Sequence, residues 1–155
     1  MANTRETRAT DPAKPLHIHR LPVRVRYPEA DSMGRLHHSV FLVYFEMGRT
    51  EYLRERGIAY ADMERTGQFI AIVSADVRYH AAAKYDDELI VETWVEEIRG
   101  ARIFFKNRAV RPGGPADTVI AEATICGALI GADGRPHRFP EEASALMFGP
   151  PKAGA

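Results

Sequence analysis

The first patterned stretch of the chain alternates apolar and charged residues. Across residues 21–27, arginines separate Val23, Val25 and Tyr27, and Pro28 follows. A period of two is typical of a strand with one buried face, and proline interrupts strand pairing. We therefore predict a first strand over residues 21–27.

A broad apolar stripe with helical spacing comes next. Apolar residues recur three and four positions apart through residues 39–56, as in a helix that buries one face. Ser39 is suited to the N-cap of this helix and Gly57 to its end. A second, brief helix is expected over residues 60–65.

Beyond residue 68 the pattern is that of strands. Four apolar segments are separated by turn sequences rich in Gly, Pro and Asp. They are residues 69–80, 88–98, 101–110 and 118–131. Residues 88–98 are partly apolar on both faces, which fits a sheet that packs on a helix with one face and on a neighbouring subunit with the other. A strand, a long helix and four antiparallel strands predict an α+β fold in which one sheet curves around one helix.

Length, charge and cysteine content exclude several classes of protein. The 155 residues correspond to one domain, and the 21 Lys and Arg balance the 21 Asp and Glu, unlike the basic excess of nucleic-acid-binding domains. No apolar run reaches the roughly 18 residues of a membrane helix. The lone cysteine, Cys126, excludes an intramolecular disulfide and a multi-cysteine metal site. We expect a cytoplasmic chain that binds neither nucleic acid nor membranes.

The two ends of the chain differ in composition from its body. The N-terminal region contains scattered arginines but no apolar run of a secretory signal, and the closing GPPKAGA is small and proline-rich. We expect a disordered arm over residues 1–19, one folded domain over residues 20–148 and a flexible tail over residues 149–155.

Polar residues that could take part in catalysis lie close together in the sequence where the first strand leads into the long helix. They are Asp31, Gly34, His37, His38 and, further along, Glu46. A carboxylate there faces the positive end of a helix dipole and its unpaired N–H groups. Backbone N–H groups at such a place polarise a carbonyl, while a carboxylate attacks it or activates water beside it. The natural reaction class is acyl transfer.

These residues also carry a family likeness. The run RVRYPEADSMGRLHHSVFLVYFE, residues 24–46, resembles the acyl-CoA thioesterases of the hotdog fold, particularly the 4-hydroxybenzoyl-CoA and YbgC-like branch. That branch has an Asp ending a polar turn, a Gly three residues on, commonly a His seven on, an aromatic residue ten on and then an acidic residue in a helix. The matching positions are Asp31, Gly34, His38, Phe41 and Glu46. The likeness continues through residues 49–57 and 77–93.

The resemblance implies a single hotdog domain and a set of catalytic roles. Members assemble as homodimers or homotetramers with active sites at the dimer interface. By this likeness Asp31 is the catalytic carboxylate, as nucleophile or general base, and the His38 backbone N–H is the oxyanion donor. Gly34 permits the turn that aims the carboxylate, and Glu46 supports the site without reacting. No metal or redox cofactor is implied, and coenzyme A is part of the substrate.

The resemblance also suggests where acyl-CoA binds. The turn between the second and third of the four later segments carries Arg99 and Arg102, where the 4-hydroxybenzoyl branch holds the phosphates of coenzyme A, and guanidinium groups suit phosphate. Ile72, Val73 and Ser74 fall where the family lines its acyl pocket.

Simpler interpretations remain open for the same residues. Asp31 by itself is equally a turn or cap residue. The side chains of His37 and His38, being adjacent, are expected to diverge, so that a zinc site would also need Asp31 to fold back. Two other functions are alternatives: a hotdog hydratase or dehydratase, which pairs Asp with a His five residues later where this chain has Leu36, and a protein that binds acyl-CoA without catalysis.

Overall fold

The computed structural model describes residues 17–152 and contains one five-stranded sheet with helices. The strands are β1 (His19–Arg24), β2 (Phe69–Tyr79), β3 (Glu88–Arg99), β4 (Arg102–Arg111) and β5 (Thr118–Ile130). The helices are α1 (Val40–Arg54), α2 (Tyr60–Arg65) and α3 (Glu141–Phe148), with a short 3-10 turn, η1 (Tyr27–Glu29), after β1.

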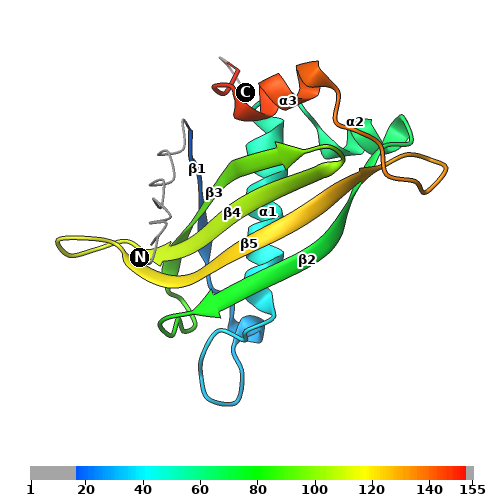
Figure 1. Cartoon of the computed structure of the whole chain (residues 1–155). Coiled ribbons are helices and arrows are strands. Elements are labelled where there is room, and N and C mark those ends of the chain that lie inside the picture. The colour runs from blue at the N-terminus through cyan, green and yellow to red at the C-terminus, as the bar shows by residue number, and fades with distance from the viewer. Residues whose placement is uncertain (1–16, 153–155) are drawn as a thin grey trace, which may run out of the picture.

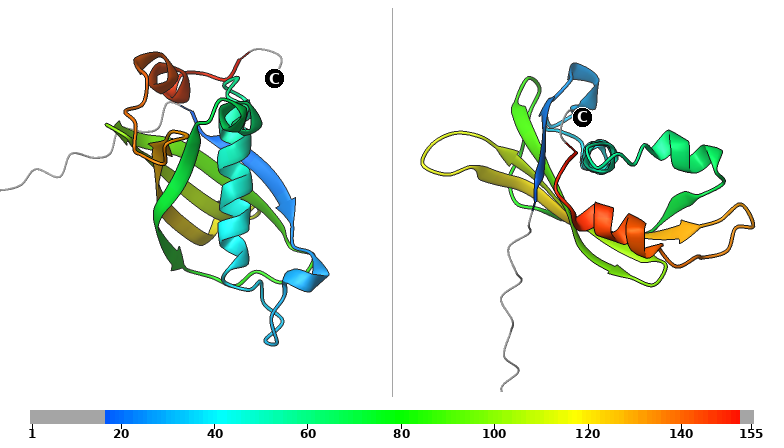
Figure 2. Two further views of the ribbon diagram at one scale, coloured as in Figure 1. Left: turned by 90° about the vertical axis from the view of Figure 1, so that its right-hand side faces the viewer. Right: turned by 90° about the horizontal axis from the view of Figure 1, so that it is seen from above.

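The sheet is antiparallel and curves around the long helix. Its strand order is β1-β3-β4-β5-β2, so β1 and β2 form the two edges. Figures 1 and 2 show α1 lying along the concave face, with the later strands curving past it. The predicted α+β architecture, one sheet wrapped around one central helix, is confirmed.

The core lies between α1 and the concave face of the sheet. Phe41 and Phe45 near the start of α1, and Tyr52 and Leu53 near its end, are almost fully buried. Burial of a large apolar side chain contributes about 1.5–3 kcal/mol, so these two groups attach both ends of the helix to the sheet. Gly48 lies between them and allows close contact, because a Cβ there would lie 2.5 Å from the Thr93 side-chain oxygen.

The predicted helices and later strands agree closely with the structure. The long helix spans residues 40–54 rather than 39–56, and the short helix spans residues 60–65 as predicted. Ser39 does occupy the N-cap, but its side chain makes no capping hydrogen bond. Its hydroxyl instead bonds the ring of His37. Helix α3 is not predicted by the sequence pattern.

The predicted first strand ends too late. β1 stops at Arg24, and Tyr27 belongs to η1 with 78% of its surface exposed. The alternation fails there because the Glu29 side chain captures both the backbone N–H and the guanidinium of Arg26, which bends the chain into the 3-10 turn. Val23 and Val25 are buried as predicted.

The predicted terminal segments lie only partly within the described residues. Residues 1–16 and 153–155 fall outside them. At the C-terminal side, the Lys152 N–H donates a hydrogen bond to the Glu55 carbonyl oxygen at 2.8 Å. None of the helices within residues 17–152 has the length and apolar character needed to cross a membrane.

Candidate active site

A tight hairpin over residues 30–36 connects η1 to the start of α1, at the lower end of the molecule in Figure 1. The Asp31 N–H donates to the Arg35 carbonyl oxygen at 2.8 Å, and the Gly34 N–H donates to the Asp31 carbonyl oxygen at 2.9 Å. Gly34 has a φ of +70°, a conformation that glycine adopts without steric cost. A residue with a side chain would be strained at this φ, so the geometry of the turn favours glycine.

The Asp31 carboxylate has one oxygen held by its own turn. Oδ1 accepts hydrogen bonds from the backbone N–H groups of Met33 at 2.8 Å and Arg35 at 3.2 Å. These donors belong to the hairpin rather than to the first turn of α1, where the sequence pattern placed the partners of the carboxylate. No donor to Oδ2 is found within residues 17–152, and the side chain is partly exposed. One oxygen is thus fixed while the other is available for chemistry.

Two histidines lie between the hairpin and the helix. The rings of His37 and His38 lie 4.2 Å apart with a 33° angle between their planes. The expectation that their side chains diverge is wrong, because both residues precede the helix in a turn, where neither helical nor strand geometry applies. The His37 Nδ1 atom lies 2.8 Å from the Ser39 hydroxyl oxygen, which fixes the inner ring.

The His38 backbone is held at its carbonyl and open at its N–H. The Tyr79 hydroxyl, at the end of β2, donates to the His38 carbonyl oxygen at 3.0 Å. Within residues 17–152, the His38 N–H donates no hydrogen bond. It is therefore available as a donor at the entrance to α1.

A buried carboxylate next to the hairpin escaped the sequence analysis. Glu29 is only 6% exposed and accepts hydrogen bonds from the Arg26 N–H at 2.8 Å and the Tyr44 hydroxyl at 2.5 Å. Burial alone would raise the pKa of Glu29, but the hydrogen bonds from Arg26 and Tyr44 outweigh it and hold the pKa below its ordinary value. Burial and the bond to Glu29 raise the pKa of Tyr44 well above its usual range. The only hint in the sequence is the three-residue spacing of Arg26 and Glu29.

The predicted acyl-binding residues lie on a sheet edge. Ile72 and Val73 on β2 are 52% and 51% exposed, and Ser74 follows at a register shift in the pairing with β5. Within residues 17–152, β2 pairs only with β5. Its outer edge therefore presents apolar side chains together with free backbone groups.

The predicted phosphate-binding arginines lie at the other end of the sheet from Asp31. Arg99 and Arg102 face each other across the turn between β3 and β4. Arg99 is exposed and its Nη2 lies 2.7 Å from a carboxylate oxygen of Glu97. The hairpin is bonded to the loop before β3 through Ala83, and β3 is 12 residues long, so at about 3.3 Å per residue the length of that strand separates these arginines from the end of the sheet that carries Asp31. Glu46 is exposed on α1. Of the predicted site residues, Asp31, Gly34 and His38 lie in the same connection between η1 and α1.

A second hairpin repeats the geometry of the first. Over residues 130–136, the Gly131 N–H donates to the Arg135 carbonyl oxygen at 3.0 Å, and the Gly134 N–H donates to the Gly131 carbonyl oxygen at 2.9 Å. These bonds correspond one for one to those of the Asp31 hairpin. The position of Asp31 is taken there by a glycine, so this turn forms without an aspartate at that position. In this second hairpin the Asp133 carboxylate accepts the Arg135 N–H at 3.0 Å, so a turn of this kind also closes with its carboxylate at another position.

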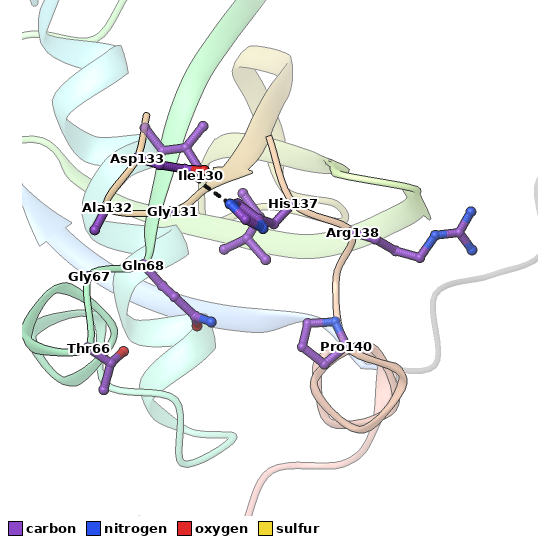
Figure 3. A pocket seen from close by; sticks show the side chains of 11 residues that line it. Thr66, Gly67, Gln68, Ile130, Gly131, Ala132, Asp133, His137, Arg138 and Pro140 are labelled. Carbon is purple, nitrogen blue, oxygen red and sulfur yellow. Dashed lines mark hydrogen bonds and ion pairs between the residues drawn. The ribbon is translucent and has the colours of Figure 1, made fainter. Parts of the chain in front are cut away.

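The second hairpin borders a cavity of about 400 Å³ that none of the predicted site residues lines. Figure 3 shows Gln68, Asp133, His137 and Arg138 around it, with the His137 Nε2 atom 3.1 Å from the Asp133 carboxylate. No motif in the sequence marks this segment. In the region that the structure describes, no three His, Cys, Asp or Glu side chains are grouped to hold a metal ion.

The family model of the thioesterase superfamily matches residues 33–118, more than half of the chain. The acyl-CoA thioesterase YbgC of Haemophilus influenzae is 36% identical over 81% of this chain and 91% of its own length. The chain belongs to the thioesterase superfamily. As a member, it is a thioester hydrolase, and the predicted likeness to the YbgC-like proteins is confirmed. The acyl-CoA thioester hydrolase YbgC of Escherichia coli is 29% identical, over 70% of the chain of this thioesterase and 78% of its own length.

A solved structure agrees with the architecture of this thioesterase. The DHNA-CoA thioesterase of Staphylococcus aureus is 27% identical and superposes with a TM-score of 0.76, covering 83% of this chain and 89% of that one. The shared architecture supports the hotdog fold expected from the sequence.

Proposed function

We propose that this thioesterase hydrolyses the thioester bond of an acyl-CoA to a free acid and coenzyme A, with Asp31 as the reacting carboxylate. The observation that carries the proposal is the Asp31 hairpin itself. One carboxylate oxygen is fixed by two backbone N–H groups while the other has no donor within residues 17–152, and the equivalent hairpin has a glycine at this position and takes its carboxylate from Asp133. The names of the YbgC relatives support acyl-CoA as the substrate class.

The hydrolysis needs a group that attacks or activates water and a donor for the oxyanion. As general base, Asp31 takes a proton from a water whose oxygen adds to the thioester carbonyl. As nucleophile, its free oxygen attacks the carbonyl and forms an anhydride, which water then hydrolyses. In both routes the carbonyl oxygen becomes negatively charged next to the His38 N–H. Collapse of this tetrahedral intermediate expels the coenzyme A thiolate, which takes a proton from Asp31 in the first route and from water in the second.

A second copy of the chain is part of the proposal. Asp31 and the pair of Arg99 and Arg102 lie at opposite ends of one sheet, too far apart to act on the same substrate molecule. Antiparallel pairing of the free β2 edges of two protomers would place the far end of one sheet near the Asp31 hairpin of the other, and would cover Ile72 and Val73. We propose a cytoplasmic homodimer, or a homotetramer built from two such dimers, with Arg99 and Arg102 on the phosphates of coenzyme A.

A thiol-release assay across a panel of acyl-CoA thioesters tests this function. Aryl, short-chain and long-chain acyl-CoA are compared with the same acyl groups on an acyl carrier protein. The proposal expects release of free coenzyme A from at least one class with kcat/KM of about 10⁴ M⁻¹s⁻¹ or more. Saturable binding of acyl-CoA without thiol release would instead indicate a binding protein, and water addition to an enoyl-CoA would indicate a hydratase.

A further inference from the structure

A buried hydrogen-bonded pair ties the segment that leads to Asp31 to the central helix. The Tyr44 hydroxyl, one turn into α1, donates to the Glu29 carboxylate at 2.5 Å. Both side chains are almost completely buried, at 3% and 6% exposure. We propose that Tyr44 and Glu29 are positioning residues that hold the Asp31 carboxylate at the entrance to α1. This inference rests on the proposed role of Asp31.

The connection from Glu29 to Asp31 is short and stiff. Glu29 is two residues before Asp31, and its carbonyl oxygen accepts the His37 N–H at 2.9 Å. That bond is the outermost backbone hydrogen bond of the hairpin, so the position of the Glu29 main chain determines the position of the hairpin. A shift of Glu29 relative to α1 therefore shifts Asp31 by a similar amount.

The Glu29 side chain is held from two directions. The Arg26 backbone N–H and the Tyr44 hydroxyl both donate to Oε2, at 2.8 and 2.5 Å. The Arg26 guanidinium donates to Oε1 through Nε at 2.9 Å and Nη2 at 2.7 Å. The Arg26 bonds are local and shape η1, whereas the Tyr44 bond is the one that reaches the helix. The Tyr44 hydrogen bond thus fixes the position of the hairpin relative to α1.

The rest of the hairpin is attached elsewhere. Leu36 is buried, and its N–H donates to the Ala83 carbonyl oxygen at 2.8 Å, in the loop between β2 and β3. Loss of the Tyr44 bond would therefore leave the hairpin folded but free to pivot about Leu36. A catalytic carboxylate misplaced by a fraction of an ångström lowers kcat more than it affects substrate binding.

The chain offers a matched control for Tyr44. Tyr52, two turns further along α1, is 2% exposed and donates its hydroxyl to the Met147 carbonyl oxygen at 2.7 Å. Replacing either tyrosine by phenylalanine removes one buried hydroxyl and its hydrogen bond from the same helix. Only Tyr44 is connected to the Asp31 hairpin.

The experiment measures kcat, KM and Tm for Tyr44→Phe and Tyr52→Phe on the best substrate of the thiol-release panel. We expect similar falls in Tm for both variants. For Tyr44→Phe alone, kcat falls by about tenfold or more with KM unchanged. The acidic limb of its kcat profile also moves to higher pH, because Glu29 without the Tyr44 donor is protonated more readily and releases the hairpin.

Glu29→Leu gives a second route if Tyr44→Phe folds poorly. It removes the acceptor of the Tyr44 hydroxyl together with the titratable group, so we expect a lower kcat with KM unchanged and no contribution of residue 29 to the acidic limb. Equal kcat and pH profiles for Tyr44→Phe, Tyr52→Phe and the wild type would overturn the inference, as would a change in KM alone. Full turnover by Asp31→Asn would instead overturn the proposed function, so the two failures are distinguishable.

Discussion

The ionised Glu29 side chain makes stability depend on pH. Its pKa in the folded protein lies below the ordinary value of 4.5, so its contribution is fully present above that value and is lost as the pH falls through the folded pKa. The buried carboxylate is therefore a site at which acid loosens the hairpin that carries Asp31.

Glu29→Gln is expected to lower the free energy of unfolding at pH 7 by about 1–3 kcal/mol, since it removes charge-assisted hydrogen bonds. The difference from the wild type should shrink as the pH falls below about 4.5 and the wild-type carboxylate takes up its proton. Urea denaturation at a series of pH values measures this. Glu88→Gln is the control, because its ion pair with Arg24 is exposed and contributes little. A constant difference at every pH would show that Glu29 is not held ionised.

Single residues of the site differ in how far the sequence reveals them. Asp31 and Gly34 are identifiable because a turn leaves a local signature of residue types and spacing. The contact of Glu29 with Tyr44 spans 15 positions and depends on how α1 packs against η1, which no local pattern encodes. The close approach of the His37 and His38 rings likewise follows from the path of a turn, not from periodicity.

At the scale of elements, Gly48 shows how closely α1 approaches the sheet. A Cβ at this position would lie 2.5 Å from the Thr93 side-chain oxygen and 2.9 Å from a Val91 methyl group. Alanine normally stabilises a helix interior relative to glycine by roughly 1 kcal/mol. Here the contacts with β3 reverse that preference, because two packed side chains would have to move.

Gly48→Ala is accordingly expected to lower the free energy of unfolding by about 1–2 kcal/mol. Because two side chains must move, the cost of overpacking lies at the upper end of its range, about 2–3 kcal/mol, and the gain in helix propensity offsets roughly 1 kcal/mol of it. Chemical denaturation monitored by circular dichroism provides the measurement. An unchanged or increased stability would mean that α1 sits further from β3 than the structure shows.

The elements themselves are predictable to different degrees. Helix α1 follows from periodicity, because it buries one face, and the later strands follow from their apolar segments and the turn residues between them. Helix α2 is short and has no buried residue. Helix α3 follows no sequence signal that stands out, since of its eight residues only Met147 is buried. The end of β1 is misplaced because the side chain of Glu29 captures Arg26 and overrides the alternation that continues through Tyr27.

At the scale of the whole molecule, the order of the strands in the sheet is a feature that the sequence pattern does not predict. Periodicity predicts the strands but not the order β1-β3-β4-β5-β2, which puts β2 at an edge and Arg99 at the opposite end of the sheet from Asp31. The family likeness groups Asp31, Arg99 and Ile72 in one site. The single chain does not bring them together, and the proposed dimer is what would unite them.

The proposed dimer predicts a specific sensitivity at the β2 edge. Ile72→Arg places a charge on the proposed interface and should convert the assembly to monomers, which sedimentation velocity reports as a fall in mass. Leu146→Arg on α3 is the control, since Leu146 is similarly exposed, at 43% against 52%, but lies away from that edge. An assembly that survives Ile72→Arg at micromolar concentration would place the interface elsewhere.

The central claim is that Asp31 takes part in the chemistry and does more than hold its own turn. Asp133 is the matched residue, because its Oδ1 also accepts a backbone N–H two residues further on, at 3.0 Å, in the equivalent hairpin. The decisive measurement is the rate of thiol release from acyl-CoA by Asp31→Asn beside Asp133→Asn, with folding checked by circular dichroism. We predict that Asp31→Asn lowers kcat by about 10²-fold or more while Asp133→Asn keeps the wild-type rate. Wild-type turnover by Asp31→Asn, or an equal loss in both variants, would contradict the account.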